Sequence, residues 1–115
     1  MTEPTIFERI VAREIPATIV EETERIIAFV DIAPQAPVHV VVTTKVARYR
    51  TVVELAEAEP ELLAELVAVA RRVASTHANG EFRLIFNSGA SAGQTVFHVH
   101  AHVLAGGLEE RALVG

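Results

Sequence analysis

Three histidines alternate with small apolar residues late in the chain, in the segment His98-Val99-His100-Ala101-His102. Successive side chains of an extended strand point to opposite faces of a sheet. The three imidazoles are therefore predicted to share one face, while the apolar residues between them enter a core. Imidazole serves as a nucleophile, as a proton carrier near neutral pH and as a metal ligand. The segment predicts a chemical site on one face of a sheet.

Two kinds of chemistry fit this histidine cluster. Three imidazoles on one face could ligate zinc and leave a fourth position open for a reactant. Alternatively, one histidine could attack as a nucleophile while its neighbours bind phosphate and transfer protons. A half-exposed strand without a chemical role is the remaining interpretation. The histidines by themselves do not separate the first two.

A loop of small residues leads directly into the histidine segment. Residues 87–94 contain two glycines, two serines and two alanines. Such a loop lets backbone N–H groups approach an anion closely. It lacks the Gly-Lys-Ser/Thr ending of a Walker A loop and is followed by a predicted strand. Together with the histidines and the hydroxyl of Thr95, the loop favours a ligand that carries phosphate.

Two helices and five strands are predicted to position these residues. Apolar residues at helical spacing over residues 6–11 predict a short helix that Pro16 ends. Pro60 fits the first position of a long helix, which Asn79-Gly80 would end. Segments rich in β-branched residues predict the strands, at residues 17–20, 25–32, 38–44, 82–86 and 95–104.

The order of these elements predicts the fold class. A helix, three strands, a helix and two strands indicate an α+β domain with a mostly antiparallel five-stranded sheet, a short N-terminal helix and one long central helix. The chain of 115 residues is half hydrophobic, which is sufficient for one core. Residues 1–115 are therefore expected to form a single domain.

Composition excludes several functional classes. The chain has no cysteine, so disulfides and thiolate metal sites are ruled out. A net charge of -5 disfavours nucleic acid as a partner. No apolar run approaches the roughly 20 residues of a membrane span, and the N-terminal segment does not resemble a secretory signal. The expectation is a soluble cytoplasmic protein that does not bind membranes.

The sequence resembles the nucleotide-binding branch of the histidine triad (HIT) superfamily over nearly its whole length. The third histidine, His102, stands where the related transferase branch carries glutamine, which favours hydrolysis. The matching segments are the signature His-φ-His-φ-His-φ-φ at residues 98–104, with residues 5–17, 28–39, 87–89 and 93–98.

The resemblance implies a HIT-like fold, a homodimer and an enzyme. Members bind purine nucleoside monophosphates and cleave their phosphoramidates through a nucleotidyl-histidine. His100 matches the nucleophile, and His102 is expected to donate the proton to the leaving amine. His39 and His98 match the supporting histidines. We expect this chemistry to need no cofactor and no metal, since neutral imidazole is already a competent nucleophile.

The resemblance also implies a nucleotide site. Asp31 matches the residue that holds the ribose hydroxyls. The apolar walls around the base correspond to Ile6, Phe7, Ile10, Phe29 and Ile32. The phosphate shell corresponds to Asn87, Gly93, Gln94, Thr95 and Val96, together with His100 and His102.

The sequence departs from the family pattern in four places, one of which is the loop at residues 88–93, where the family often has Ser-Asp-Gly-Gly. Residues 44–47 lack the proline and histidine of the family's Pro-Lys-x-His segment. Thr5 and Glu8 stand where some members carry a zinc-binding cysteine pair, so no such structural site is expected. The tail after Gly106 lacks an aromatic segment that shapes the leaving-group pocket in some members. The leaving group is therefore left open, and a nucleotide-binding regulatory module with vestigial catalysis is the alternative function.

Overall fold

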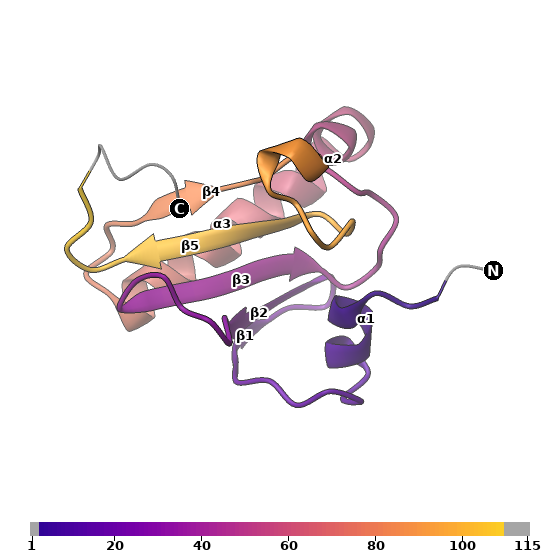
Figure 1. The fold of residues 1–115 in the computed structure, drawn as a ribbon. Helices are drawn as coiled ribbons and strands as arrows, with labels where there is room; N and C mark the ends of the chain where they lie inside the picture. Colours follow the sequence, from indigo (N-terminus) through magenta and orange to yellow (C-terminus); the bar gives the residue numbers. More distant parts are fainter. Residues whose placement is uncertain (1–2, 110–115) are drawn as a thin grey trace.

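The structure is an antiparallel sheet with helices on both faces (Figure 1). The computed structural model describes residues 3–109, and within them the strand order is β1-β2-β3-β5-β4. The helices are α1 (Ile6–Val11), α2 (Val52–Ala58), α3 (Pro60–His77) and the 3₁₀ helix η1 (Ala90–Ala92). The strands are β1 (Ile19–Glu22), β2 (Ile26–Val30), β3 (Val38–Thr44), β4 (Arg83–Ile85) and β5 (His100–Ala105). The predicted α+β architecture is confirmed.

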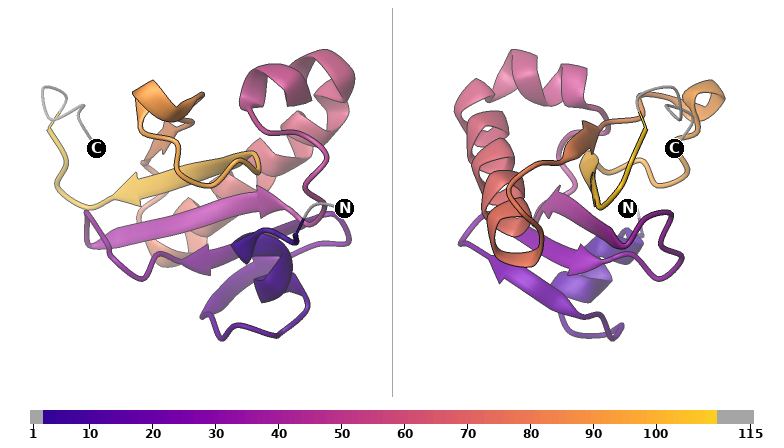
Figure 2. Two further views of the ribbon diagram at one scale, coloured as in Figure 1. Left: turned by 45° about the vertical axis from the view of Figure 1, so that its right-hand side comes forward. Right: turned by 90° about the vertical axis from the view of Figure 1, so that its left-hand side faces the viewer.

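The long helix α3 begins and ends where the sequence predicts. Pro60 occupies its first turn, where the missing N–H is not needed. Gly80 has a φ of 91°, and its N–H donates to the carbonyl of Ala74, which closes the last turn. The buried stripe of the helix consists of Leu62, Leu66, Val69, Ala70, Val73 and Ala74. This stripe packs on the sheet, so α3 covers one whole face of it (Figure 2).

The short helix α1 ends earlier than the sequence predicts. Its start is fixed by a capping box, in which the Thr5 side chain accepts from the N–H of Glu8 and the Glu8 side chain accepts from the N–H of Thr5. The helix stops at Val11 rather than at Pro16, because Arg13 adopts a φ of 64° and leaves the helical conformation. The chain then leaves the helix and reaches β1, which begins at Ile19.

Strand β3 has the predicted bounds, whereas the other strands are shifted or shorter. Strand β1 starts two residues after the expected position and includes Glu21 and Glu22, which the sequence placed in the turn. The turn falls instead at Thr23, whose hydroxyl accepts from the N–H of Arg25 and of Ile26. This side-chain bond satisfies the turn, so β1 extends closer to it than composition alone indicates, whereas β2 (Ile26–Val30) begins one residue later than predicted.

Strand β5 begins at His100, five residues later than predicted. The backbone of Val99 does not join the ladder, because its N–H donates to the carbonyl of Tyr49 and its carbonyl accepts from the Thr43 hydroxyl. His98 therefore lies before the strand. The prediction that three histidines share one strand holds only for His100 and His102.

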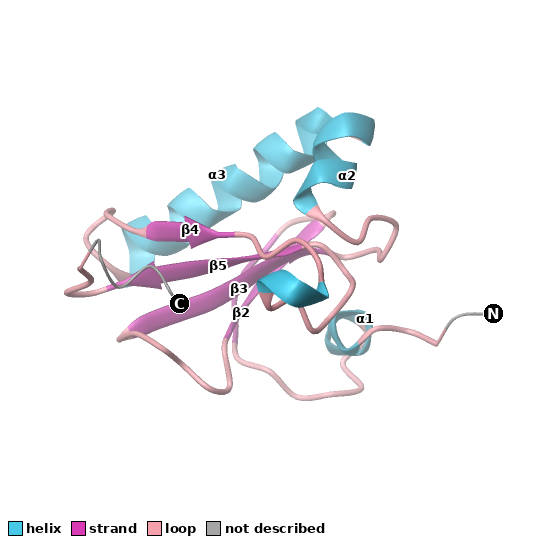
Figure 3. Ribbon diagram, turned by 45° about the horizontal axis from the view of Figure 1, so that its top comes forward, coloured by secondary structure: helices cyan, strands magenta, loops and turns pink. Residues whose placement is uncertain are grey.

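The two faces of the sheet have separate cores. Side chains such as Val40, Val42, Ala101 and Val103 point toward α3. The opposite face carries Ile27, Phe29 and Val41, which pack against Phe7 and Ile10. Figure 3 shows the ribbon of α1 on the other side of the sheet from α3. His39, His100 and His102 alternate with the α3-facing residues, so they lie on the α1 face. Among the residues described, no helix is long and apolar enough to cross a bilayer.

Candidate active site

A pocket opens on the α1 face of the sheet. Its volume is about 530 Å³, within the range of small-molecule sites. The predicted site residues that line it are Ile6, Phe7, Ile10, Phe29, Asp31, Ile32, His39, Asn87, Gly93, Thr95, Val96, His100 and His102. His98 and Gln94 are not among the lining residues. The fold thus gathers side chains from α1, three strands and two loops around one cavity.

One end of this pocket is apolar. Phe7 and Phe29 are buried, with ring centroids 5.6 Å apart, and Ile10 lies beside them. Ile32 stands at the rim with 94% of its surface exposed. An exposed isoleucine at the mouth of a cavity is suited to cover a flat ligand. This end of the pocket has the character of a wall for an aromatic ring.

His100 presents an unprotonated nitrogen in the pocket. Its Nδ1 lies 2.7 Å from the carbonyl oxygen of His98. A carbonyl only accepts, so Nδ1 must carry the proton and Nε2 the lone pair of the neutral ring. Burial lowers the pKa of His100, which favours this neutral form. Phe7 packs edge-on against the ring with centroids 4.8 Å apart, which holds its orientation.

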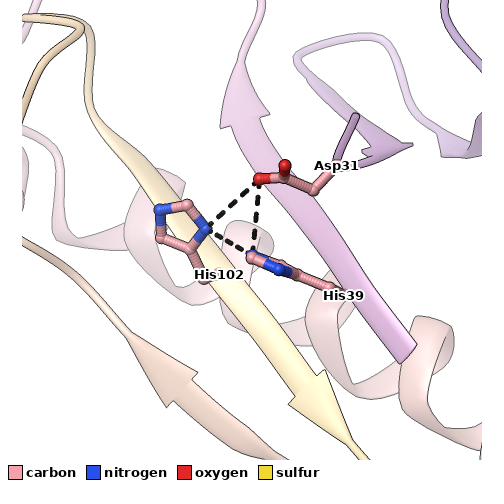
Figure 4. A group of neighbouring side chains, drawn as sticks. All are labelled: Asp31, His39 and His102. Atoms are coloured by element: carbon pink, nitrogen blue, oxygen red, sulfur yellow. Dashed lines mark hydrogen bonds and ion pairs between the residues drawn. The ribbon is translucent and has the colours of Figure 1, made fainter. Parts of the chain in front are cut away.

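A chain of hydrogen bonds fixes the tautomers of His39 and His102. The backbone N–H of Gln35 donates to Nδ1 of His39 at 2.9 Å. The proton of neutral His39 is therefore on Nε2, which lies 2.9 Å from Nδ1 of His102. Since Nδ1 of His102 accepts this bond, neutral His102 carries its own proton on Nε2. Figure 4 shows Nδ1 of His102 turned toward His39 and Asp31, with its other nitrogen on the far side of the ring.

The environment of His102 disfavours its charged form while the pocket is empty. Burial and the neighbouring His100 and His39 lower its pKa to about 4. The carboxylate of Asp31 opposes them, with Oδ2 at 3.9 Å from Nδ1 of His102 and 3.4 Å from Nε2 of His39. Its other oxygen accepts from the N–H of Ala33, which holds the side chain in place. An anionic ligand beside His102 would raise its pKa again.

His98 supports the site from beneath and does not line the pocket. It is fully buried, and its Nε2 donates to the carbonyl of Thr44 at 2.6 Å. Its Nδ1 accepts from the hydroxyl of Thr5 at 2.7 Å. Both ring nitrogens are therefore occupied by the protein. His98 positions His100 through its carbonyl oxygen and is not placed to contact a ligand.

Gln94 holds the small-residue loop rather than contributing to the pocket lining. Its buried side chain donates to the carbonyls of Arg50 and Val96 and accepts from the N–H of Gly89. The backbone N–H groups of Gly93 and Gln94 are also used within the loop, where they donate to Ala90 and Gly89. Every polar atom of the Gln94 side chain thus has a protein partner, so this side chain positions the loop.

The structure does not assemble the metal site that three strand histidines suggested. Within residues 3–109, the grouping with metal-compatible spacing is Asp31, His39 and His102, whose ligand atoms lie within 4.8 Å of one another. Ligation through Nε2 of His39 would require a lone pair there. The N–H of Gln35 places that lone pair on Nδ1 instead. The hydrogen-bond pattern fits a proton pathway better than a metal centre.

Several contributing residues were not identified from the sequence. Gln35 sets the tautomer of His39, and Thr5 and Thr44 set that of His98. Ile85 and Leu104 complete the pocket wall beside the histidines. The position of Gln35 in the loop Pro34-Gln35-Ala36-Pro37, four residues before His39, was the available signal. No sequence pattern indicated the contacts across 93 residues that join Thr5 to His98.

Comparison with known proteins agrees with this arrangement. The family model for the HIT domain matches residues 12–107. An uncharacterized HIT-like protein of Synechocystis is 47% identical over 110 residues, covering 92% of this chain and 93% of the relative. The purine nucleoside phosphoramidase of Escherichia coli is 37% identical over 108 residues, covering 92% and 90%. A HIT family hydrolase from Clostridium thermocellum has a TM-score of 0.84 at 42% identity, covering 92% and 93%. Since the family model covers most of its length and these relatives match nearly all of it, the chain belongs to the histidine triad (HIT) family.

Proposed function

We propose that this protein is a cytoplasmic nucleoside phosphoramidase that cleaves the P–N bond of purine nucleoside 5'-monophosphoramidates. The observation that carries the proposal is the unprotonated Nε2 of His100 in the same pocket as His102, whose free nitrogen bears a proton. A nucleophile and a proton donor two residues apart on β5 can act on the two sides of one bond. The similarity to a purine nucleoside phosphoramidase supports this choice of substrate.

The first step transfers the nucleotide to His100. The lone pair on Nε2 forms a bond to phosphorus while the P–N bond to the amine breaks, and that bond's electron pair goes to the amine nitrogen. The anionic phosphoryl group raises the pKa of His102, which takes up a proton at Nδ1 on substrate binding, and Asp31 Oδ2 then replaces Nδ1 as the acceptor for the N–H of His39. Protonated His102 then gives a proton to the departing amine and becomes neutral. Asp31 Oδ2 is near enough to both His39 and His102 to counter the positive charge before transfer.

The second step releases the nucleotide. Water attacks phosphorus and passes a proton to neutral His102, while the electron pair of the P–Nε2 bond returns to His100. The products are the amine and the nucleoside monophosphate, and both histidines regain their earlier protonation. The hydroxyl of Thr95 and the amides of Thr95 and Val96 are the groups we assign to the phosphoryl oxygens. The Gly93 and Gln94 amides are engaged within the loop.

The direct experiment is a turnover assay with adenosine 5'-phosphoramidate, in which release of ammonia and AMP is followed. The proposal expects stoichiometric appearance of both products. The alternative function, a nucleotide-binding regulatory module, expects AMP to bind without turnover of the phosphoramidate. Measuring AMP affinity by calorimetry on the same preparation therefore separates the two.

Asp31 is expected to set affinity for the ribose. An ionised carboxylate can accept from two hydroxyls, and bonds to charged groups contribute about 1.5–3 kcal/mol. Asp31→Ala should weaken AMP binding by about tenfold or more, as measured by calorimetry. Asp31→Asn keeps the shape of the side chain and loses its charge. Its affinity for AMP should lie between those of the unaltered protein and Asp31→Ala. Equal losses with 2',3'-dideoxy-AMP would contradict a ribose contact.

Activity is expected to withstand metal removal. The proposed steps use only imidazoles, a hydroxyl and backbone amides, and the tautomer of His39 disfavours metal ligation. Dialysis against EDTA should leave phosphoramidate turnover unchanged. Loss of activity that zinc restores would instead support a metal-dependent hydrolase.

The protein is expected to form a homodimer. Strand β4 lies at the edge of the sheet, and open edges favour pairing with another chain. Val67 of α3 adds exposed apolar surface, and two-fold pairing is the commonest way to cover such faces. Light scattering at micromolar concentration should give twice the 12.4 kDa chain mass. A mass of one chain at that concentration would contradict the dimer.

A further inference from the structure

The pocket lining formed by the described residues contains no side chain with a permanent positive charge. Among the described residues that line it, the ionisable groups are the carboxylate of Asp31 and the imidazoles of His39, His100 and His102. No lysine or arginine of residues 3–109 reaches the lining. This is unusual chemistry for a phosphate site, where Arg and Lys commonly neutralise the anion.

Six basic side chains of the described residues form ion pairs with glutamates outside the pocket. Arg13 and Lys45 both pair with Glu22, at 2.9 Å and 2.7 Å. Arg25 pairs with Glu65 at 2.8 Å. Further ion pairs join Arg48 to Glu59, Arg50 to Glu54 and Arg72 to Glu21. These contacts hold six basic side chains against carboxylates outside the pocket.

The imidazoles replace these cations only in part. Burial lowers the pKa of His100 and of His102, so both rings are neutral near pH 7 in the empty pocket. Beneath them, burial also lowers the pKa of His98, whose nearest acidic influence is Glu8 of α1. A ligand anion therefore meets dipoles and N–H donors, with one carboxylate of its own sign nearby. Hydrogen-bond donors and a protonated His102 can neutralise the first negative charge of a phosphoryl group. The described lining offers no further positive charge to neutralise a second.

We propose that the phosphate end of the pocket selects a phosphoryl group bearing a single negative charge. The inference rests on the proposed function and defines its substrate class more narrowly. A nucleoside phosphoramidate, with one oxygen replaced by nitrogen, has one such charge. The product AMP acquires a second charge as its phosphate ionises with a pKa of about 6. The site thus favours the substrate over its product, and also over nucleoside di- and triphosphates, which assists product release.

The test compares two ligands that differ in charge and hardly in shape. Adenosine 5'-methylphosphonate carries one negative charge and has no leaving group, whereas AMP carries two at about pH 8. Calorimetry in low salt should show the methylphosphonate binding about fivefold or more tightly than AMP, with ADP weaker still. AMP binding as tightly as the methylphosphonate, or more tightly, would overturn the inference. Failure of adenosine and of both anions to bind would overturn the proposed function, and this inference with it.

A variant with an added cation provides the matched control. Asn87 lines the pocket, so Asn87→Lys should bring an ammonium group to it, while Asn87→Met adds similar length without charge. Both variants lose the Asn87 amide and differ from each other in charge, so Asn87→Lys should favour AMP over the methylphosphonate about fivefold or more relative to Asn87→Met. If Asn87→Lys bound adenosine normally and kept its preference for the methylphosphonate over AMP, the charge of the phosphoryl group would not determine ligand affinity.

Discussion

His100→Ala is expected to reduce phosphoramidate turnover by about 10⁴-fold or more, the scale that follows removal of a catalytic nucleophile. The reason is that no other lining imidazole can replace it. His39 and His102 use Nε2 and Nδ1 to bond to each other, and His98 lies outside the pocket with both nitrogens occupied. Steady-state release of ammonia from adenosine 5'-phosphoramidate gives the measurement.

The control for His100→Ala is nucleotide binding. Its ring contributes one wall beside Phe7, whereas the base and ribose ends of the pocket are built by other residues. AMP should therefore still bind to the variant through its base and ribose contacts, with a loss of affinity limited to the contact of His100 with the phosphate. Substantial turnover by His100→Ala would show that another group attacks phosphorus.

His102→Ala is expected to lose about 10² to 10⁴-fold in turnover on an amine leaving group, the usual contribution of a positioned acid. An amine leaves poorly unless it is protonated, and the proton donor that we propose is Nε2 of His102, the nitrogen turned away from His39. A phenol or an acyl phosphate needs no such proton, so the same variant should lose much less on those leaving groups. The ratio of the two losses is the measured quantity.

His102→Gln serves as the matched control for this prediction. A glutamine amide can keep a hydrogen bond to the neighbouring His39, but it cannot transfer a proton at neutral pH. Turnover of the amine substrate should fall as far as in His102→Ala, while nucleotide affinity is better preserved. Equal losses on amine and phenol leaving groups would assign His102 to phosphate binding instead.

The elements with strong local signals were predicted well. Pro60 and Gly80 mark the two ends of α3. The missing N–H of proline and the positive φ of glycine are local properties, so their effect on a helix end can be predicted from the sequence. Strand β3 was found because its run of valine and threonine is long and uninterrupted. The histidines that the alternating pattern placed on one face include His100 and His102, and the structure adds His39 and Asp31 beside His102.

The details that depend on tertiary contacts were not predictable. The start of β5 is decided by the bonds of Val99 to Tyr49 and Thr43, which are far away in the sequence. The bond by which the Gln94 side chain joins the small-residue loop to the backbone of Arg50 likewise spans 44 residues and has no signal in the sequence. The protonated nitrogen of each histidine likewise follows from partners on other elements. Spacing indicates which side chains share a face, but it does not reveal the hydrogen bonds made behind that face.

The central claim is that Nε2 of His100 forms a covalent bond to phosphorus. The most direct measurement is acid-free quenching of the reaction within its first turnovers, followed by mass spectrometry of the peptides. The account predicts a nucleotidyl adduct on His100, and its absence from the peptide of His100→Ala. An adduct on His39, His98 or His102, or rapid turnover with no adduct on any histidine, would contradict it.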